Sequence, residues 1–182
     1  MPQLTDREII ELCRDPKQRE RGFRLLLAAY KERTYWHIRR IVIDHEDAND
    51  IVQNTFVKVW KNLEGFRQDA GLFSWIYRIA TNESLNYLRK LKNQSNVSID
   101  KVEFLLANRI DDNSLMSGDE IERKLQKALL ELPEKQRLVF NMRFYDDLKY
   151  QEISEILGTS PGGLKASYHH AVKKIEEKLK ED

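Results

Sequence analysis

A stretch near the C-terminus combines basic, imidazole and small side chains at a spacing that suits contact with double-stranded DNA. At 100° per residue they fall on one face of a helix predicted from Pro161 to about Lys180. Amines bind phosphates or guanine, imidazoles hydrogen-bond base edges, and an alanine methyl approaches thymine. The candidate duplex-binding residues on this face are Lys165, Ala166, His169, His170 and Lys173.

The adjacent imidazoles of His169 and His170 have two other interpretations, a solvated surface or half of a metal site. Neighbouring positions on a helix point about 100° apart, so the pair chelates poorly. The chain has a single cysteine, Cys13, which lies far away in the sequence. We therefore favour DNA contact over plain surface, and we expect no metal.

The residues before this helix have the pattern of a helix-turn-helix motif, which presents its second helix to a major groove. Tyr150–Leu157 predicts a short amphipathic helix, Gly158 and Thr159 predict a turn, and Ser160 is a good N-cap before Pro161. The other side of the last helix is apolar. We expect that side to be buried through Leu164, Tyr168, Ala171, Val172, Ile175 and Leu179.

A second helix, predicted over Leu72–Lys92, carries a basic face with an exposed tryptophan and two asparagines. Arginine binds phosphates, asparagine reads base edges, and tryptophan stacks on an unpaired base. The candidate residues for contact with melted DNA are Trp75, Arg78, Asn82, Asn86 and Arg89. A solvated helix whose tryptophan packs on a neighbour fits the charge pattern equally well. Glu83 falls within the apolar arc of this helix, and the sequence offers no reason for it.

A third helix, predicted over about Asp47–Leu63, has an acidic outer face. An acidic first turn complements the helix dipole, so a purely structural interpretation exists. The same charge repels DNA, which makes a protein the better partner for this face. The candidate protein-binding residues are Asp47, Asp50, Gln53, Asn54 and Val57, opposite a predicted core arc of Val52, Thr55, Phe56, Val59 and Leu63.

The elements that hold these three faces are predicted to be entirely helical. The 182 residues include only 7 Gly and 4 Pro, and apolar residues recur at helical spacing. Thr5 with Glu8 has the form of a capping box, and a helix over Arg19–Ile43 is expected to break near Thr34. The net charge of only +1 favours no class of partner.

The composition changes between two helical halves. A polar, poorly periodic stretch predicts a linker over residues 93–118, between domains at 1–92 and 119–182. Its middle, VEFLLA, fits either a short helix or a docked segment, and we expect the halves to fold independently. The lone cysteine, the absence of a signal-peptide pattern and the lack of a long apolar run lead us to expect a cytoplasmic protein without membrane insertion.

Several of these motifs, in this order, resemble those of an extracytoplasmic-function (ECF) sigma factor of bacterial RNA polymerase. The segment from Asp47 to Phe56 resembles the family's Asp-Ala-x-Asp-x-x-Gln-x-x-Phe signature of region two. Phe73–Asn82 and Leu88-Arg89 resemble the promoter-reading segment that follows. Leu132–Phe140 and Tyr150–Gly158 resemble region four. The resemblance covers nearly the whole chain except the linker.

The resemblance implies two domains that bind DNA and polymerase. The acidic face would dock on the β′ clamp helices of core RNA polymerase, and region four would also hold the β flap tip. The Glu64–Gly71 loop with the basic face would capture the melted minus-ten element of promoter DNA, and the last helix would read the minus-thirty-five element. An anti-sigma factor is a further candidate partner. At the start of the recognition helix, the segment Gly162-Gly163-Leu164-Lys165-Ala166 departs from the Gly-Thr-Val-Lys/Arg-Ser pattern of many members.

Two other functional classes remain as alternatives. A stand-alone helix-turn-helix regulator would have no need of a helix with an acidic face and an exposed Val57. An enzyme would need a nucleophile elbow, a phosphate-cradling glycine loop or metal-ligand spacing, and the sequence has none of these motifs. We therefore expect no catalytic residue and no cofactor.

Overall fold

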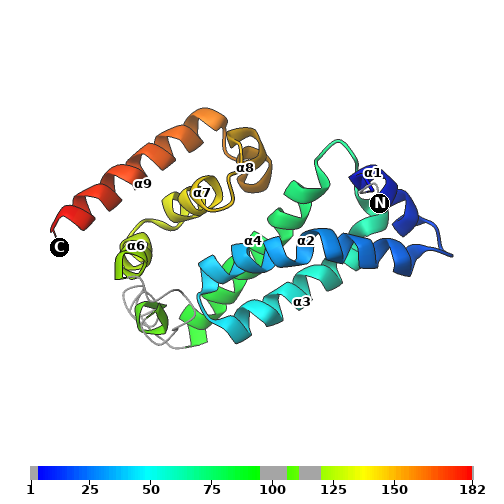
Figure 1. The fold of residues 1–182 in the computed structure, drawn as a ribbon, viewed down its shortest axis with the longest axis horizontal. Helices are drawn as coiled ribbons and strands as arrows, with labels where there is room; N and C mark the ends of the chain where they lie inside the picture. The colour runs from blue at the N-terminus through cyan, green and yellow to red at the C-terminus, as the bar shows by residue number, and fades with distance from the viewer. Residues whose placement is uncertain (1–3, 95–105, 111–119, 182) are drawn as a thin grey trace.

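A computed structural model describes residues 4–94, 106–110 and 120–181, and all regular structure within them is helical. The prediction of an all-α fold is therefore confirmed (Figure 1). The first half contains α1 (Asp6–Arg14), α2 (Arg19–Val42), α3 (His45–Asn62), a 3-10 turn (Leu63–Gly65) and α4 (Leu72–Gln94). The second half contains α6 (Glu120–Leu130), α7 (Glu134–Phe144), α8 (Tyr150–Leu157) and α9 (Pro161–Glu181).

Local signals fix where several helices begin and end. Thr5 and Glu8 form the expected capping box at α1, with the Thr5 amide donating to Glu8 Oε2 at 2.7 Å. Asp44 caps α3 by accepting from the Asp47 amide, so this helix begins two residues before the predicted start. Gly158 ends α8 at φ 68°, a left-handed conformation that favours glycine, and Ser160 accepts from the Gly163 amide at the start of α9.

Helix α2 runs without interruption, so the predicted break near Thr34 is wrong. Thr34 is fully buried in the middle of this helix. Threonine costs only a fraction of a kcal/mol in a helix, and packing of the buried face outweighs so small a preference.

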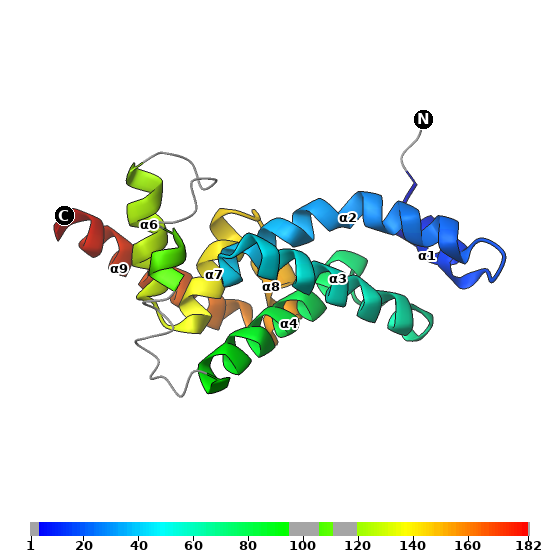
Figure 2. The same ribbon diagram turned by 90° about the horizontal axis from the view of Figure 1, so that it is seen from below.

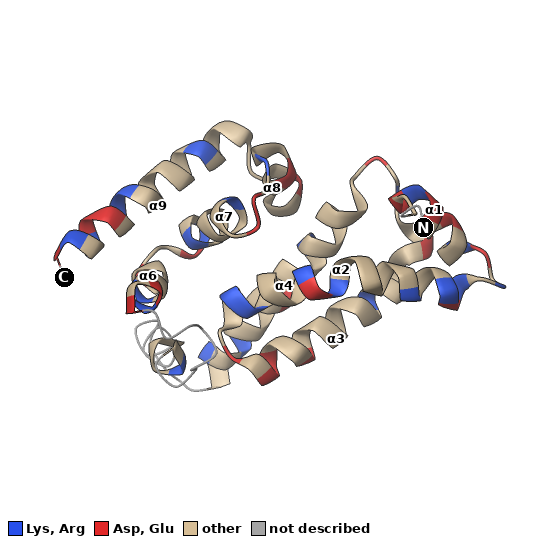
Figure 3. Ribbon diagram, in the orientation of Figure 1, with Lys and Arg blue, Asp and Glu red and all other residues tan. Residues whose placement is uncertain are grey.

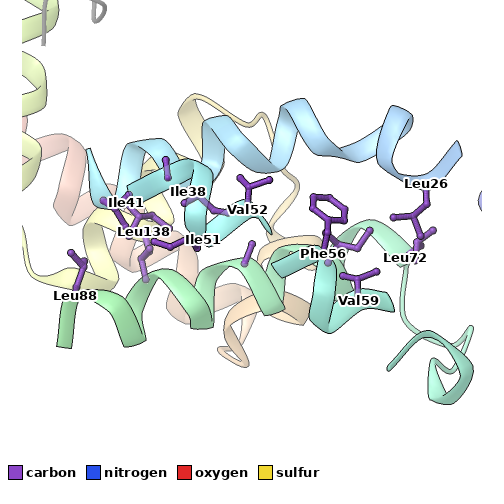
Figure 4. Packing of buried hydrophobic residues seen from close by; sticks show 14 of the residues in the cluster. Leu26, Ile38, Ile41, Ile51, Val52, Phe56, Val59, Leu72, Leu88 and Leu138 are labelled. Carbon is purple, nitrogen blue, oxygen red and sulfur yellow. The ribbon is translucent and has the colours of Figure 1, made fainter. Parts of the chain in front are cut away.

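The core of the first half lies between α2, α3 and α4 (Figure 4). Leu26 of α2 and Leu72 of α4 lie at one end of this core, and Ile38 of α2 lies toward the other end. Phe56 and Val59 of α3 lie between them. The predicted core arc of α3 is buried throughout, through Val52, Thr55, Phe56, Val59 and Leu63. This packing turns the opposite, polar side of α3 to solvent.

Helices α6 to α9 form the second half, in which α9 packs on α6, α7 and α8. The helix-turn-helix pair α8 and α9 is held by Ile153, Ile156 and Leu164 against Val139 and Met142 of α7. Figure 1 shows α7 and α8 lying between α9 and the first half, and Figure 2 gives the same arrangement from below.

The two halves pack directly against each other, chiefly through α4 with α8 and α2 with α7. Tyr77 of α4 is completely buried within the second half's cluster, and Leu138 of α7 reaches the cluster of the first half. Separate fragments would expose both residues. Independent folding of the halves stays a prediction. Loss of these shared contacts would make each separate half less stable than it is in the full chain.

Of the predicted linker, residues 106–110 are described and form a short helical stretch; residues 95–105 and 111–119 lie outside the described part. Leu106 and Ile110 are each 1 % exposed and join the first half's core. Arg109 donates to Asp47 Oδ2 at 3.1 Å. Residues 106–110, which include only the last two residues of VEFLLA, are thus both helical and docked, and the rest of VEFLLA lies outside the described residues.

Gly22 of α2 lies tightly against the backbone of α1, and this contact gives a stability prediction. A Cβ there would lie 2.6 Å from the Cys13 backbone nitrogen and 2.8 Å from the Leu12 carbonyl carbon. We expect Gly22→Ala to lower the free energy of unfolding by about 1–3 kcal/mol, because backbone atoms cannot move aside as a flexible side chain can. Urea unfolding measures the change. The control Gly162→Ala places its methyl in open space and should unfold like the wild type; equal stability of both variants would contradict the argument.

Candidate nucleic-acid and protein interfaces

The predicted duplex-binding face lies on the solvent side of α9. Lys165, Ala166, His169, His170 and Lys173 are all exposed, while Leu164, Ala171 and Ile175 are buried on the opposite side. Leu179 was expected in the buried arc but is 37 % exposed near the end of the helix. Basic residues recur along α9 and are interrupted by the acidic pair Glu176 and Glu177 before the last turn (Figure 3).

The side chains of this face are exposed, and Lys165 also contacts a neighbouring helix. The rings of His169 and His170 lie 6.1 Å apart between centroids, and Lys165 lies near the Tyr150 ring of α8. Within the described residues no group of three His, Cys, Asp or Glu side chains is placed to hold a metal ion. The face therefore presents imidazole and amine groups outward from a rigid helix.

Helix α4 has three distinct sides, of which the sequence had indicated two. One side packs on α2 and α3, and a second side, including Phe73, Tyr77 and Leu88, faces the second half of the chain. The third side is open to solvent. It carries the predicted residues for melted DNA, with Arg78, Asn82, Asn86 and Arg89 exposed and Trp75 half-buried.

Trp75 lines a pocket at the N-terminal end of this open side. Its ring packs on Phe66 at 4.7 Å between centroids, and the pocket of about 410 Å³ is completed by the loop after the 3-10 turn and by Arg78. Arg14 of α1 holds that loop by donating to the Phe66 carbonyl at 2.6 Å. Trp75 therefore packs on a neighbour and also borders an open pocket, and its stacking on an unpaired base stays a prediction.

The unexplained Glu83 pairs with Lys58 of α3 across the helix interface. Together with Asn54 and Asn86 this pair lines a groove of about 500 Å³ between α3 and α4. The acidic outer face of α3 and the basic open side of α4 thus border the same groove (Figure 3).

The predicted protein-binding face of α3 is largely exposed. Asp50, Gln53, Asn54 and Val57 all face solvent, with Val57 50 % exposed. Beside Val57 an apolar groove of about 380 Å³ runs between α2 and α3, lined by Phe23, Leu27, Phe56 and Trp60 among others. The α2 side of this groove was missed from the sequence, because periodicity within one helix does not reveal which helix lies next to it.

Asp47 differs from the other residues of this face. Its side chain is 26 % exposed and accepts from Arg109 Nη1 and from the Tyr87 hydroxyl. Burial raises the pKa of Tyr87, and the hydrogen bond to the Asp47 carboxylate raises it further. Asp47 is therefore occupied within the chain, whereas Asp50, Gln53, Asn54 and Val57 are exposed.

Both halves of the chain match a known protein family. The family model for Sigma-70 region 2 matches residues 26–94, and the family model for Sigma-70, region 4 matches residues 122–175. The ECF RNA polymerase sigma-E factor of Haemophilus influenzae is 28% identical over 186 residues, covering 97% of this chain and 96% of that protein. The protein of that name in Escherichia coli K12 is 29% identical over 185 residues, covering 97% and 95%.

Two solved structures share the fold. CnrH, solved in complex with the cytosolic domain of CnrY, superposes with a TM-score of 0.72 at 22% identity over 97% of this chain and 98% of that one. The sigma factor RpoE of Bartonella quintana, solved in complex with the anti-sigma factor NepR, gives a TM-score of 0.67 at 21% identity over 88% and 98%. Among the described helices none has the length and apolarity needed to cross a bilayer.

Proposed function

The chain belongs to the sigma-70 family of bacterial RNA polymerase subunits, in its extracytoplasmic-function group, and on that basis we propose which surface performs each step of promoter recognition. It is a sigma factor that binds core RNA polymerase and directs initiation by recognising and melting promoter DNA. The mechanism is binding: the chain stabilises the open form of the promoter and thereby shifts an equilibrium.

The open side of α4 is assigned to the melted minus-ten element. The observation that carries the proposal is the pocket bordered by Trp75, Phe66 and Arg78, continuous with a row of exposed amide and guanidinium groups. An aromatic wall stacks on an unpaired base, and the arginines hold the backbone phosphates of the strand. Capture of an extruded base in this pocket offsets part of the cost of unpairing it.

The exposed face of α9 is assigned to the minus-thirty-five element in duplex form. The exposed face of α3, with Asp50, Gln53, Asn54 and Val57, is assigned to the β′ clamp helices, and the second half to the β flap. We propose domains at 1–92 and 119–182 for these roles, a cytoplasmic location beside the polymerase, and no catalytic residue. An anti-sigma factor is proposed as a regulatory partner, supported by a sigma factor of the same fold, RpoE of Bartonella quintana, that was solved with such a partner.

Transcription with purified components tests the proposed function. The full chain with core polymerase should yield transcripts from templates selected out of a library of randomised upstream elements, and core polymerase alone should not. A stand-alone regulator would bind duplex DNA in the absence of polymerase and give no transcript. Binding to duplex DNA without any transcript would overturn the assignment of this chain as a sigma factor.

Substitutions on α9 should separate base reading from phosphate binding. We expect His169→Ala or His170→Ala to relax sequence preference at one or two upstream positions by about 1–3 kcal/mol, because a base contact discriminates between sequences. Lys173→Ala should weaken binding to all sequences alike and reduce the salt dependence by about one released counterion. Selection over randomised upstream elements, with salt titrations, measures both effects. Lys180→Ala removes the same charge from the last turn and should leave sequence preference unchanged; wild-type preference in both histidine variants would exclude this face as the reader.

A further inference from the structure

The contact between the two halves contains a buried ionic group centred on Asp146, just after α7. The Asp146 side chain is 4 % exposed. Its carboxylate accepts from Arg40 Nη1 at 2.9 Å and faces His37 Nδ1 at 3.2 Å, and its backbone carbonyl accepts from Arg33 Nη2 at 3.1 Å. All three partners belong to α2, in the other half of the chain; we call these four residues the Asp146 cluster.

The first half holds the partners of Asp146 in place through contacts of its own. The His37 ring is 1 % exposed, stacks on Tyr77 at 4.3 Å between centroids, and places Nε2 2.8 Å from Thr81 Oγ1. The Tyr77 hydroxyl donates to the Arg33 carbonyl at 3.1 Å, and the Arg33 guanidinium lies over the Phe73 ring at 4.0 Å. Helices α2 and α4 therefore present a fixed cationic site to Asp146.

A carboxylate in this position favours one closed arrangement over others. Burial of a carboxylate is unfavourable unless charged and hydrogen-bonding partners surround it. Both carboxylate oxygens of Asp146 contact α2, so the side chain is compensated when the halves are joined in this pose. Apolar contacts such as Tyr77 with Val139 and Met142 add area, but they tolerate sliding far better than an ion pair does.

We propose that the Asp146 cluster locks the two halves in a closed state, which must open before the chain can bind both promoter elements. Their centres lie about 25 base pairs apart, or roughly 85 Å along the duplex at 3.4 Å per pair. A compact chain of this length has a radius of gyration of only about 16 Å. The open side of α4 and the face of α9 are both exposed in the closed state, so each could engage DNA separately but not together across that distance. This consequence rests on the proposed function, whereas the lock itself does not.

Small-angle X-ray scattering of the full chain tests the lock. Asp146→Asn keeps the shape of the side chain and removes its charge, and we expect it to shift the closed–open equilibrium toward the open form by roughly 10- to 100-fold. The radius of gyration should rise while helicity by circular dichroism stays the same. Asp147→Asn is the matched control, because it makes the same change next door, where the side chain is 97% exposed and asparagine suits the local φ of 52°.

An unchanged radius of gyration in Asp146→Asn would overturn the proposal. If that variant loses helicity instead, Arg40→Gln decides from the other half: expansion with intact helicity supports the lock, and an unchanged radius overturns it. Loss of helicity in both variants would assign the cluster to folding and also overturn it.

The affinity for core polymerase separates the lock from the proposed function. If both hold, Asp146→Asn should bind core polymerase about tenfold more tightly than the wild type, because the cost of opening has been removed. The radius of gyration of Asp146→Asn could rise while neither the wild type nor the variant binds core polymerase. That outcome would support the lock and refute the polymerase assignment.

Discussion

The double substitution Asp50→Arg with Asn54→Arg should lower the affinity of the chain for core polymerase by at least about 30-fold, as expected for a contact that contributes about 2 kcal/mol. Both side chains are exposed one turn apart on α3, so the double substitution reverses the charge of the proposed docking face without disturbing its buried side. Arginine is a good helix former, and helicity should be retained. Titration of labelled chain with core polymerase measures the change.

The matched control lies on α2, where Ala28 and Glu32 have the same spacing and are also exposed. Ala28→Arg with Glu32→Arg alters the net charge by the same amount and should leave the polymerase affinity near that of the wild type. Equal losses in the two double variants would mean that charge in general, and not the α3 face, controls binding. Asp47 is left intact because its carboxylate already pairs with Arg109 inside the chain.

Loss of the Trp75 ring should reduce promoter opening more than it reduces binding to closed duplex. Stacking on a base contributes about 1–3 kcal/mol, so Trp75→Ala should lower the yield of open complex by roughly 5- to 150-fold. Asn82→Ala should have a smaller effect in the same direction, because its exposed amide can contact only a base edge or the strand. Permanganate footprinting reports the unpaired thymines, and gel mobility reports the closed complex.

Thermal melting separates the two roles of Trp75. Trp75→Ala removes the packing on Phe66 and should lower the melting temperature modestly, whereas Asn82→Ala should melt like the wild type. Trp36→Ala, which removes a 43 % exposed tryptophan from α2, controls for loss of an aromatic surface and should open promoters normally. Normal opening by Trp75→Ala with a large drop in melting temperature would make Trp75 a core residue only.

Helical periodicity predicted the faces that a single helix determines alone. The 100° repeat placed His169, His170 and Lys173 opposite Leu164 and Ile175, and the structure has them exposed and buried in that order. The same repeat assigned Asp50 and Asn54 to the outer side of α3. These assignments needed no knowledge of the neighbouring helices, since an amphipathic helix has one buried side by default.

What periodicity could not predict is the contact between elements far apart in the sequence. Helix α4 buries Tyr77 together with the polar side chains of Thr81 and Ser84, a pattern too polar to be distinguished from a solvated face. Asp146 in a Tyr-Asp-Asp turn has the appearance of an ordinary surface residue until Arg40 and His37 are brought beside it. The position of Glu83 within the apolar arc of α4 is likewise explained only by its ion pair with Lys58 of α3.

The docked position of residues 106–110 sets the length of the tether between the halves. While Arg109 is held by Asp47, the ten covalent steps from residue 110 to residue 120 limit the distance between these two residues to about 35 Å at most. Once that segment is released, the 26 steps from residue 94 to residue 120 can reach about 90 Å. A partner that takes over Asp47 would therefore more than double the reach of the second domain, and would lower the effective concentration at which the two halves meet again.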